Sequence, residues 1–253
     1  ARDHYGPYTP GFVTVPYGDV DALAAAITDR TVAFLVEPIQ GEAGVILPPT
    51  GYLQAVRELC TERGILMIAD EIQSGMCRAG AVFACDLVDV QPDVRILGKA
   101  LGGGLLPVSA VTADWDVLGV IAPGQHGSTF GGNPLAAAVG IKVVELVETS
   151  GLADRSRRLG EHVLATLRGA NLAGIKEIRG SGLWWAVELD GTGRTGREVS
   201  LELLARGILA KDTHTWTIRF APPLVVSEAD LDAALGTIID VLISSGDSDS
   251  VDT

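Results

Sequence analysis

The sequence contains few cysteines and few basic residues. Its 253 residues include only three cysteines, Cys60, Cys77 and Cys85, and none has CxxC spacing. An odd number without that spacing argues against a disulfide framework and a zinc site, and suits a reducing cytoplasm. Lys plus Arg total 19 against 32 for Asp plus Glu, a formal charge of -13. Because negative charge repels phosphates and anionic lipids, nucleic acid and membrane surfaces are poor candidate partners.

Long apolar runs and common catalytic motifs are also missing. The best candidate for a spanning helix, Leu135 to Val147, is interrupted by Lys142 and Glu145, so no segment reaches the roughly 18–20 apolar residues that a membrane span needs. The motifs GxxxxGK[ST], HExxH and GxSxG are absent, and the four histidines show no metal-ligand spacing. We therefore expect a soluble protein without a metal site.

The sequence is rich in apolar residues that are arranged in alternating patterns. Hydrophobic residues make up 47% of the chain and charged residues 20%, enough to bury roughly 70–75% of the unfolded surface. Short β-branched runs alternate with helical patterns, which predicts an α/β fold with a mainly parallel sheet. Strands that read as covered on both faces are expected at 32–36 and 65–69. Further strands are expected at 94–97 and 108–112, and a helix capped by Asn133 and Pro134 is expected to run to about Glu148.

The pattern changes after Gly151 and predicts a second, smaller α/β domain. We expect helices at 154–168 and 197–206, strands at 175–179, 182–189 and 216–221, and a last helix opened by a capping box at Ser227 and Asp230. The chain is therefore divided into residues 1–150, part of a larger domain, residues 151–246, a small C-terminal domain, and residues 247–253, a flexible acidic tail.

Polar residues that follow apolar strands form the first candidate site. Ligands of open parallel sheets gather at the carboxyl ends of the strands, where Asp70, Gln73 and Lys99 are expected. Lys99 is one of only four lysines. A lysine desolvated beside an apolar strand would have a lowered pKa and could attack a carbonyl. The structural alternatives are a turn capped by Asp70 with Glu71 in solvent, and a Lys99 that only extends to the surface.

Two weaker signals lie elsewhere in the chain. The hydroxyls of Ser128 and Thr129 precede a helix start, where free amides and the helix dipole favour an anion. Arg219 lies in an otherwise apolar run and needs a carboxylate or a ligand beside it. Glu42 follows another apolar strand. A structural ion pair explains Arg219 as well as ligand binding does.

Four segments resemble, in order, the signatures of the subgroup III aminotransferases, which use pyridoxal phosphate. They are EPIQGE at 37–42, DEIQ at 70–73, GKAL at 98–101 and GSTFGGNP at 127–134. Longer strings at 42–47, 49–53 and 218–224 are most similar to the ornithine aminotransferase branch. The similarity runs from about Tyr5 to Ile243. It implies part of the large domain of the aspartate-aminotransferase-like fold, which binds the cofactor, followed by the family's small C-terminal domain.

The resemblance implies a cofactor role for five residues. Lys99 would attach covalently to pyridoxal phosphate and later move a proton between substrate and cofactor. Asp70 would pair with the pyridine nitrogen, and Gln73 with the phenolic oxygen of the ring. Ser128 and Thr129 would reach the cofactor phosphate of a neighbouring subunit. A dimer is therefore implied.

The resemblance also implies how substrates are handled. Glu42 and Arg219 resemble a gate that is paired while ornithine binds and opens to free the arginine for the carboxylate of glutamate or 2-oxoglutarate. The implied reaction converts L-ornithine and a 2-oxo acid into L-glutamate 5-semialdehyde and an L-amino acid. Glu42 and Arg219 are therefore the candidate substrate-binding residues.

The main departure from the family is at the beginning of the chain. Ala1 corresponds to a loop midway through the family's large domain, so we expect the glycine-rich phosphate turn, the ring-stacking aromatic residue and the substrate-binding arginine to be missing. Ser74 and Gly102 are milder departures. We therefore expect a transaminase portion that needs a separate N-terminal chain. The alternatives are a noncatalytic remnant, or a relative that acts on acetylornithine or 4-aminobutyrate.

Overall fold

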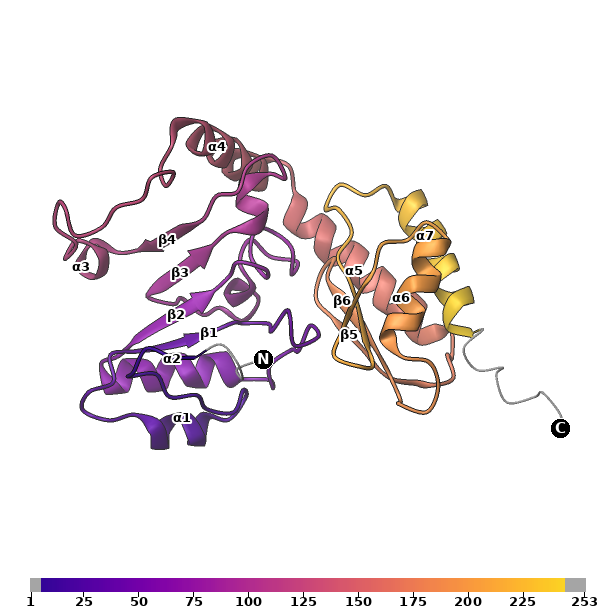
Figure 1. Ribbon diagram of the computed structural model, residues 1–253, viewed down its shortest axis with the longest axis horizontal. Helices are drawn as coiled ribbons and strands as arrows, with labels where there is room; N and C mark the ends of the chain where they lie inside the picture. Colours follow the sequence, from indigo (N-terminus) through magenta and orange to yellow (C-terminus); the bar gives the residue numbers. More distant parts are fainter. Residues whose placement is uncertain (1–5, 244–253) are drawn as a thin grey trace.

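The computed structural model describes residues 6–243, which form two lobes, each built on a four-stranded sheet (Figure 1). The predicted division at residue 150 falls between α4 and α5, and the predicted tail at 247–253 lies outside the described residues. The first lobe contains α1 (Val20–Ala26), β1 (Ala33–Val36), α2 (Tyr52–Arg63), β2 (Leu66–Asp70), η1 (Ala84–Val88), β3 (Val94–Leu97), η2 (Lys99–Gly102), β4 (Ala110–Ala113), α3 (Trp115–Leu118) and α4 (Pro134–Thr149). The second contains α5 (Leu152–Gly169), β5 (Ile175–Gly180), β6 (Trp185–Leu189), α6 (Gly196–Ala205), β7 (Lys211–Thr213), β8 (Thr217–Phe220) and α7 (Glu228–Ile243).

The first sheet has the order β1-β2-β3-β4, with the first three strands parallel and β4 antiparallel to β3. Val36 is paired with Ala69, and Asp70 with Ile96. The carboxyl ends of the three parallel strands therefore meet at one edge of the sheet. This is the edge at which the candidate site was expected.

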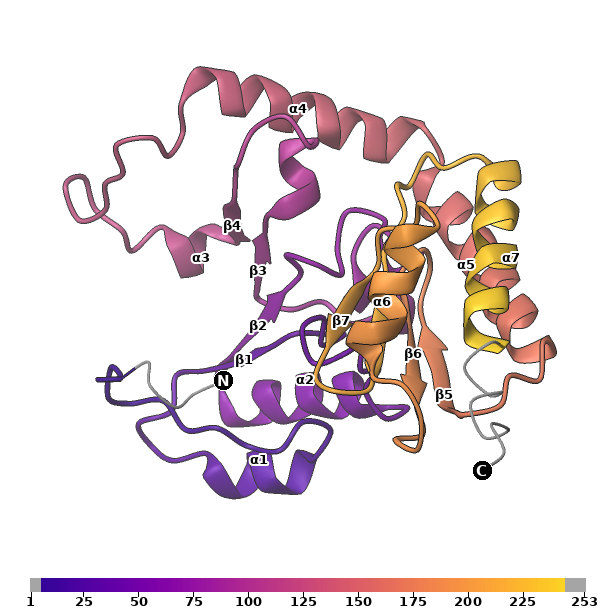
Figure 2. The same cartoon turned by 45° about the vertical axis from the view of Figure 1, so that its right-hand side comes forward.

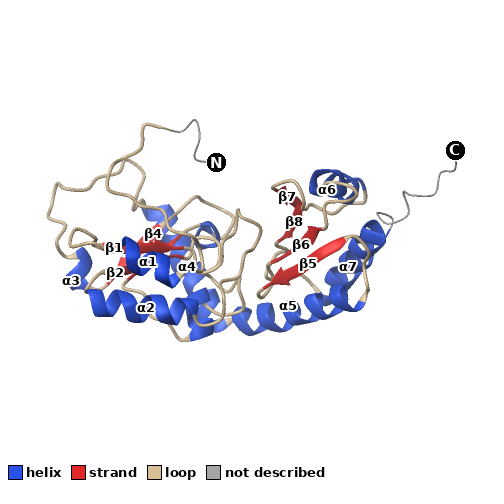
Figure 3. Ribbon diagram, turned by 90° about the horizontal axis from the view of Figure 1, so that it is seen from below, coloured by secondary structure: helices blue, strands red, loops and turns tan. Residues whose placement is uncertain are grey.

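Helices cover this first sheet mainly on one face. α1 and α2 pack on the face that includes the fully buried Met67 and Ala69 (Figures 1 and 3). On the opposite face, Leu35 of β1 is 54% exposed, and Leu66 and Ile68 of β2 are half-buried. The expectation that these strands are covered on both faces is therefore wrong for β1 and only partly met for β2 in the described chain, because the helices pack mainly against one face.

The second sheet is antiparallel, with the order β5-β6-β8-β7. Alternation along β6 separates its two faces: Trp185 and Val187 join the core formed with α5, α6 and α7, whereas Trp184 and Ala186 pack against first-lobe residues. The same alternation on β8 turns Arg219 away from the helices. This explains how a charged residue lies within an apolar strand.

Local capping explains where two long helices begin. The Asn133 side chain accepts a hydrogen bond from the amide of Ala136 at 2.9 Å, and Pro134 occupies the first turn of α4, as predicted. Ser227 accepts from the amide of Asp230 at 3.0 Å at the start of α7. Within residues 6–243, no helix is long and apolar enough to cross a membrane.

Candidate functional site

The carboxyl edge of the parallel strands brings Asp70, Gln73 and Lys99 onto neighbouring segments. Asp70 ends β2, Gln73 lies in the following turn, and Lys99 comes two residues after the paired strand β3. One carboxylate oxygen of Asp70 accepts a hydrogen bond from the amide of Ile72 at 3.0 Å. Asp70 therefore does cap a turn. Its other oxygen has no hydrogen-bond partner in the described part of the chain and can accept from a ligand.

Lys99 has an unusual backbone and an exposed side chain. It opens η2 with a φ of 44°, in the left-handed region that non-glycine residues seldom adopt. Such conformations are concentrated at functional sites. The expectation of a lysine desolvated by its own strand is not met, because no segment among residues 6–243 covers this side chain. The amine is therefore accessible at the strand edge.

A buried carboxylate fixes the turn that bears Gln73. Glu71 is fully buried, so the alternative that placed it in solvent is wrong. Its carboxylate accepts hydrogen bonds from the Ser74 hydroxyl at 2.6 Å and from the amides of Ala84 and Cys85 at 3.0 and 2.9 Å. These bonds compensate the cost of burying the charge. Ser74, a departure from the family pattern, still supplies a hydroxyl here.

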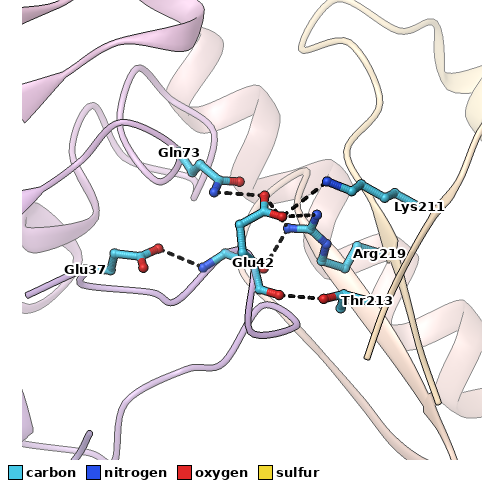
Figure 4. Close-up of polar contacts among 7 residues, drawn as sticks. Glu37, Glu42, Gln73, Lys211, Thr213 and Arg219 are labelled. Atoms are coloured by element: carbon cyan, nitrogen blue, oxygen red, sulfur yellow. Dashed lines mark hydrogen bonds and ion pairs between the residues drawn. The ribbon is translucent and has the colours of Figure 1, made fainter. Parts of the chain in front are cut away.

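The second group of site residues lies between the lobes, centred on Glu42 (Figure 4). Arg219 donates to both carboxylate oxygens of Glu42, at 3.1 and 3.2 Å, and to the carbonyl of Gly41 at 2.7 Å. Lys211 donates to Glu42 at 3.2 Å, and the Gln73 amide donates at 3.3 Å. The expected pairing of Glu42 with Arg219 is therefore present, and Gln73 connects this pair to the strand edge.

The positive charges beside Glu42 explain the ionisation state of its carboxyl. Desolvation would raise the pKa of its carboxyl, but the hydrogen bonds and charges of Arg219 and Lys211 outweigh this and lower the pKa to about 2. Glu42 is therefore ionised at neutral pH. The Arg219 side chain is only 7% exposed, whereas that of Glu42 is 62% exposed. The Arg219 guanidinium is therefore held in a buried position, and the Glu42 carboxylate lies between it and the solvent.

Ser128 and Thr129 are not brought to this site by their own chain. Both are exposed, in the loop between α3 and α4, which projects from the first sheet beyond β4 (Figures 1 and 2). The Ser128 hydroxyl accepts from the amide of Gly131 at 2.8 Å, a bond within the loop. No hydrogen bond of either hydroxyl reaches the strand edge that carries Lys99 among the described residues.

Arg78 is an interlobe residue that sequence reasoning missed. Its guanidinium donates to the carbonyls of Leu183 at 2.8 Å and Pro222 at 2.6 Å, both in the second lobe. Ser156 donates to the carbonyl of Arg78 at 3.0 Å. Because Pro222 follows Arg219 by three residues, these bonds hold the end of β8 against the turn after β2. The only sequence signal was a charged residue within a glycine-rich loop.

Other nucleophiles and metal ligands are not assembled. The three cysteines are free and buried, and desolvation raises the pKa of each thiol, which makes them poor nucleophiles. No group of three or more His, Cys, Asp or Glu side chains that could hold a metal ion occurs among the described residues. Lys99 is therefore the nucleophile best placed at the strand edge.

Comparisons with known proteins find related sequences along almost the whole chain. The class-III aminotransferase family matches residues 2–242. The chain is 49% identical to the ornithine aminotransferase of Oceanobacillus iheyensis, over 96% of this chain and 60% of that protein. It is 52% identical to that of Bacillus subtilis, over 94% of this chain and 59% of that protein. The chain thus spans about 60% of the length of these relatives.

Solved structures give the same result for the fold. An ornithine aminotransferase from Toxoplasma gondii superposes with a TM-score of 0.93 at 44% identity, covering 96% of this chain and 58% of that one. An acetylornithine aminotransferase from Elizabethkingia anophelis gives 0.88 at 44% identity, covering 93% and 63%. The predicted fold class is confirmed.

Proposed function

Because the chain belongs to the class-III aminotransferase family, we propose that it is the Lys99-bearing portion of a pyridoxal-phosphate-dependent ornithine aminotransferase. The reaction converts L-ornithine and a 2-oxo acid into L-glutamate 5-semialdehyde and an L-amino acid. The observation that carries the proposal is the meeting of two groups: Asp70, Gln73 and Lys99 at the strand edge, and the Glu42–Arg219 pair that Gln73 contacts.

The residues at the strand edge fit the cofactor in their chemistry. Asp70 has a carboxylate oxygen without a partner among the described residues, which suits a protonated ring nitrogen. Lys99 offers an accessible amine that would carry the cofactor, and Gln73 an amide that would hold its phenolic oxygen. When bound, pyridoxal phosphate supplies an electron sink for the charge left on a deprotonated substrate carbon. Lys99 would then hold and return that proton as general base and acid.

The Glu42–Arg219 pair supports a site for two substrates of different charge. While the pair is closed, Arg219 is occupied and the surface presents the Glu42 carboxylate to the amine of ornithine. When Glu42 moves off, the planar guanidinium can bind the carboxylate of a 2-oxo acid with two parallel hydrogen bonds. This pairing favours the ornithine assignment. The acetylornithine aminotransferase of Elizabethkingia anophelis is also similar to this chain, so the amino donors must be compared directly.

Several surfaces support completion of the site by other chains. Lys99 is exposed, and an apolar groove of about 580 Å³ runs along α4 and reaches η2 at Leu101, lined by residues that also include Val108 and Ile141. A segment equivalent to the N-terminal part of the relatives would cover both. The projecting loop with Ser128 and Thr129 suits a homodimer in which each subunit reaches its partner's cofactor phosphate. The free, buried cysteines suit the cytoplasm.

The proposal is tested by reconstitution. The chain is mixed with pyridoxal phosphate and the segment of the Bacillus subtilis relative that precedes the matched region. We expect a visible absorption band and amino transfer from L-ornithine to 2-oxoglutarate. Both should be lost in Lys99→Ala and kept in Lys176→Ala, a matched control on β5 whose side chain is also exposed. A band that survives in Lys99→Ala would refute the assignment of the lysine.

Two further outcomes separate the alternatives. A wild-type mixture that neither forms the band nor transfers the amino group would favour a noncatalytic chain. Faster transfer from acetylornithine or 4-aminobutyrate than from ornithine would move the assignment to those donors. Acetylornithine keeps the terminal amine that is transferred but loses the charge of the α-amine, so this comparison measures whether the site prefers a cation at the α-amine.

A further inference from the structure

Glu42 has a second cationic partner besides Arg219. Lys211 lies on β7 and is paired in register with Arg219 on the antiparallel strand β8. Residues opposite each other in such a pair project from the same face of the sheet, with Cβ atoms about 5 Å apart. Both cations therefore point at the same carboxylate. Like charges directly opposite destabilise a sheet, and Glu42 compensates both.

Arg219 and Lys211 differ in how tightly the surrounding residues hold their side chains. Arg219 is 7% exposed and is also held by the carbonyl of Gly41. Lys211 is 68% exposed and, among the described residues, bonds only to Glu42. Its flexible four-carbon stem lets the ammonium follow a moving carboxylate. Glu42 is itself held at its backbone, where Thr213 donates to its carbonyl at 2.5 Å, so only its side chain needs to move.

Formal charge shows why a second partner matters. The three charged side chains in direct contact, Glu42, Lys211 and Arg219, sum to +1. Glu37 faces the amide of Gly41 instead, at 3.0 Å. A substrate carboxylate on Arg219 brings the group to zero when Lys211 is present. Without Lys211 the same event leaves two carboxylates beside one cation.

We propose that Lys211 is a positioning residue: it holds the Glu42 carboxylate in place when Arg219 is released to bind the carboxylate of an incoming substrate. The inference rests on the proposed function, because the incoming substrate is the 2-oxo acid of the second half-reaction. Lys211 would thus act mainly on the half-reaction of the 2-oxo acid, because the Glu42–Arg219 pair stays closed in the ornithine half-reaction.

The first experiment needs no activity and uses the 253-residue chain alone. The pKa of the Glu42 carboxyl is measured by NMR in wild type, Lys211→Met, Arg219→Gln and the double variant. If Lys211 can hold Glu42 by itself, the pKa in Arg219→Gln stays below its ordinary value and returns to that value only in the double variant. A full return in Arg219→Gln alone would overturn the proposal. Should Arg219→Gln fail to fold, an unchanged pKa in the exposed Lys211→Met variant would overturn it too.

The second experiment separates the half-reactions in the reconstituted enzyme. For Lys211→Met we expect KM for 2-oxoglutarate to rise about two- to fivefold, the range for an exposed ion pair, and KM for ornithine to change by less. Lys211→Arg should restore the wild-type value. Equal effects on both half-reactions would overturn the inference and leave the proposed function standing. If wild type transfers no amino group, the proposed function fails, and the NMR series alone decides whether Lys211 holds Glu42.

Discussion

The two lobes differ in how completely the described residues cover their sheets. The second sheet packs against α5, α6 and α7 on one face and against the first lobe on the other. The first sheet is packed mainly on one face, and α4 beside it carries exposed apolar side chains such as Leu135 and Ile141. The second lobe therefore supplies its own core, whereas the first lobe and its site residue Lys99 have surfaces suited to a partner.

The core of the second lobe should show the largest effect of a single substitution. Leu203 on α6 is fully buried, and Leu203→Ala should lower the free energy of unfolding by about 2–5 kcal/mol, through lost burial and the cavity left behind. Leu204, the next residue, is 51% exposed, and Leu204→Ala should change stability by no more than about 0.5 kcal/mol. Urea denaturation measures both. Equal losses of stability in Leu203→Ala and Leu204→Ala would show that the second lobe does not have a well-packed core of its own.

Packing of α5 against the turn that joins β5 and β6, within the second lobe, should show the next largest effect. A Cβ at Gly160 on α5 would lie 2.1 Å from the carbonyl oxygen of Gly182. Gly160→Ala must therefore push backbone apart and should cost about 1–3 kcal/mol. Gly169→Ala, at the open end of the same helix, meets no atom within 4 Å and should be neutral or stabilise by up to about 1 kcal/mol. Thermal unfolding of the two variants tests whether α5 packs this tightly against the β5–β6 turn.

The uncovered surface of the first lobe predicts an effect on association. Ile141 is 70% exposed and lines the groove along α4. Ile141→Gln should leave the stability of the chain alone within about 0.5 kcal/mol. It should weaken binding of the N-terminal segment by about 1.5 kcal/mol, roughly tenfold, because a buried isoleucine would become polar. Leu201→Gln, an exposed residue of the second lobe, is the control for calorimetry. Unchanged affinity for Ile141→Gln would place the partner elsewhere.

Features defined by short-range pattern could be predicted from the sequence. The strand β3 was predicted at its observed bounds, Val94–Leu97, because three of its four residues are apolar and form a strand-like run. The Asn133 cap was predicted from two residues. By contrast, β7 was missed because Lys211, Asp212 and Thr213 are polar and too few to show alternation, and their strand conformation is set by pairing with β8.

The candidate site also contains residues whose position could be predicted from the sequence and residues whose position could not. Asp70 and Lys99 follow predicted strands, so their common edge could be expected from the sequence. Glu42 and Arg219 are 177 residues apart, and no periodicity reports a contact over that distance; only the resemblance suggested it. The burial of Glu71 could not be predicted, because two of its partners are backbone amides at the start of η1, 13 and 14 residues further along.

The smallest expected effect is electrostatic and lies between the lobes. The pKa of Glu42 is about 2 in the folded chain and ordinary, near 4.5, once unfolded. A carboxyl with a lowered pKa stabilises the fold above pH 4.5, and this contribution is lost as the pH falls from 4.5 towards 2. Because Glu42 is 62% exposed, solvent screening limits the contribution to about 0.2–1 kcal/mol.

Glu42→Gln should therefore lower the free energy of unfolding at pH 7 by that small amount, and the difference from wild type should shrink between pH 4.5 and 2. Urea titrations at several pH values measure this difference and cancel the other carboxyls, which are common to both proteins. A difference that stayed constant with pH would mean that Glu42 stabilises the fold through packing and not through its charge. The lobes would then be held together by their other contacts, such as the hydrogen bonds of Arg78 and the bond from Arg179 to the carbonyl of Gly44, and the Glu42–Arg219 pair would be free to open at almost no cost in stability.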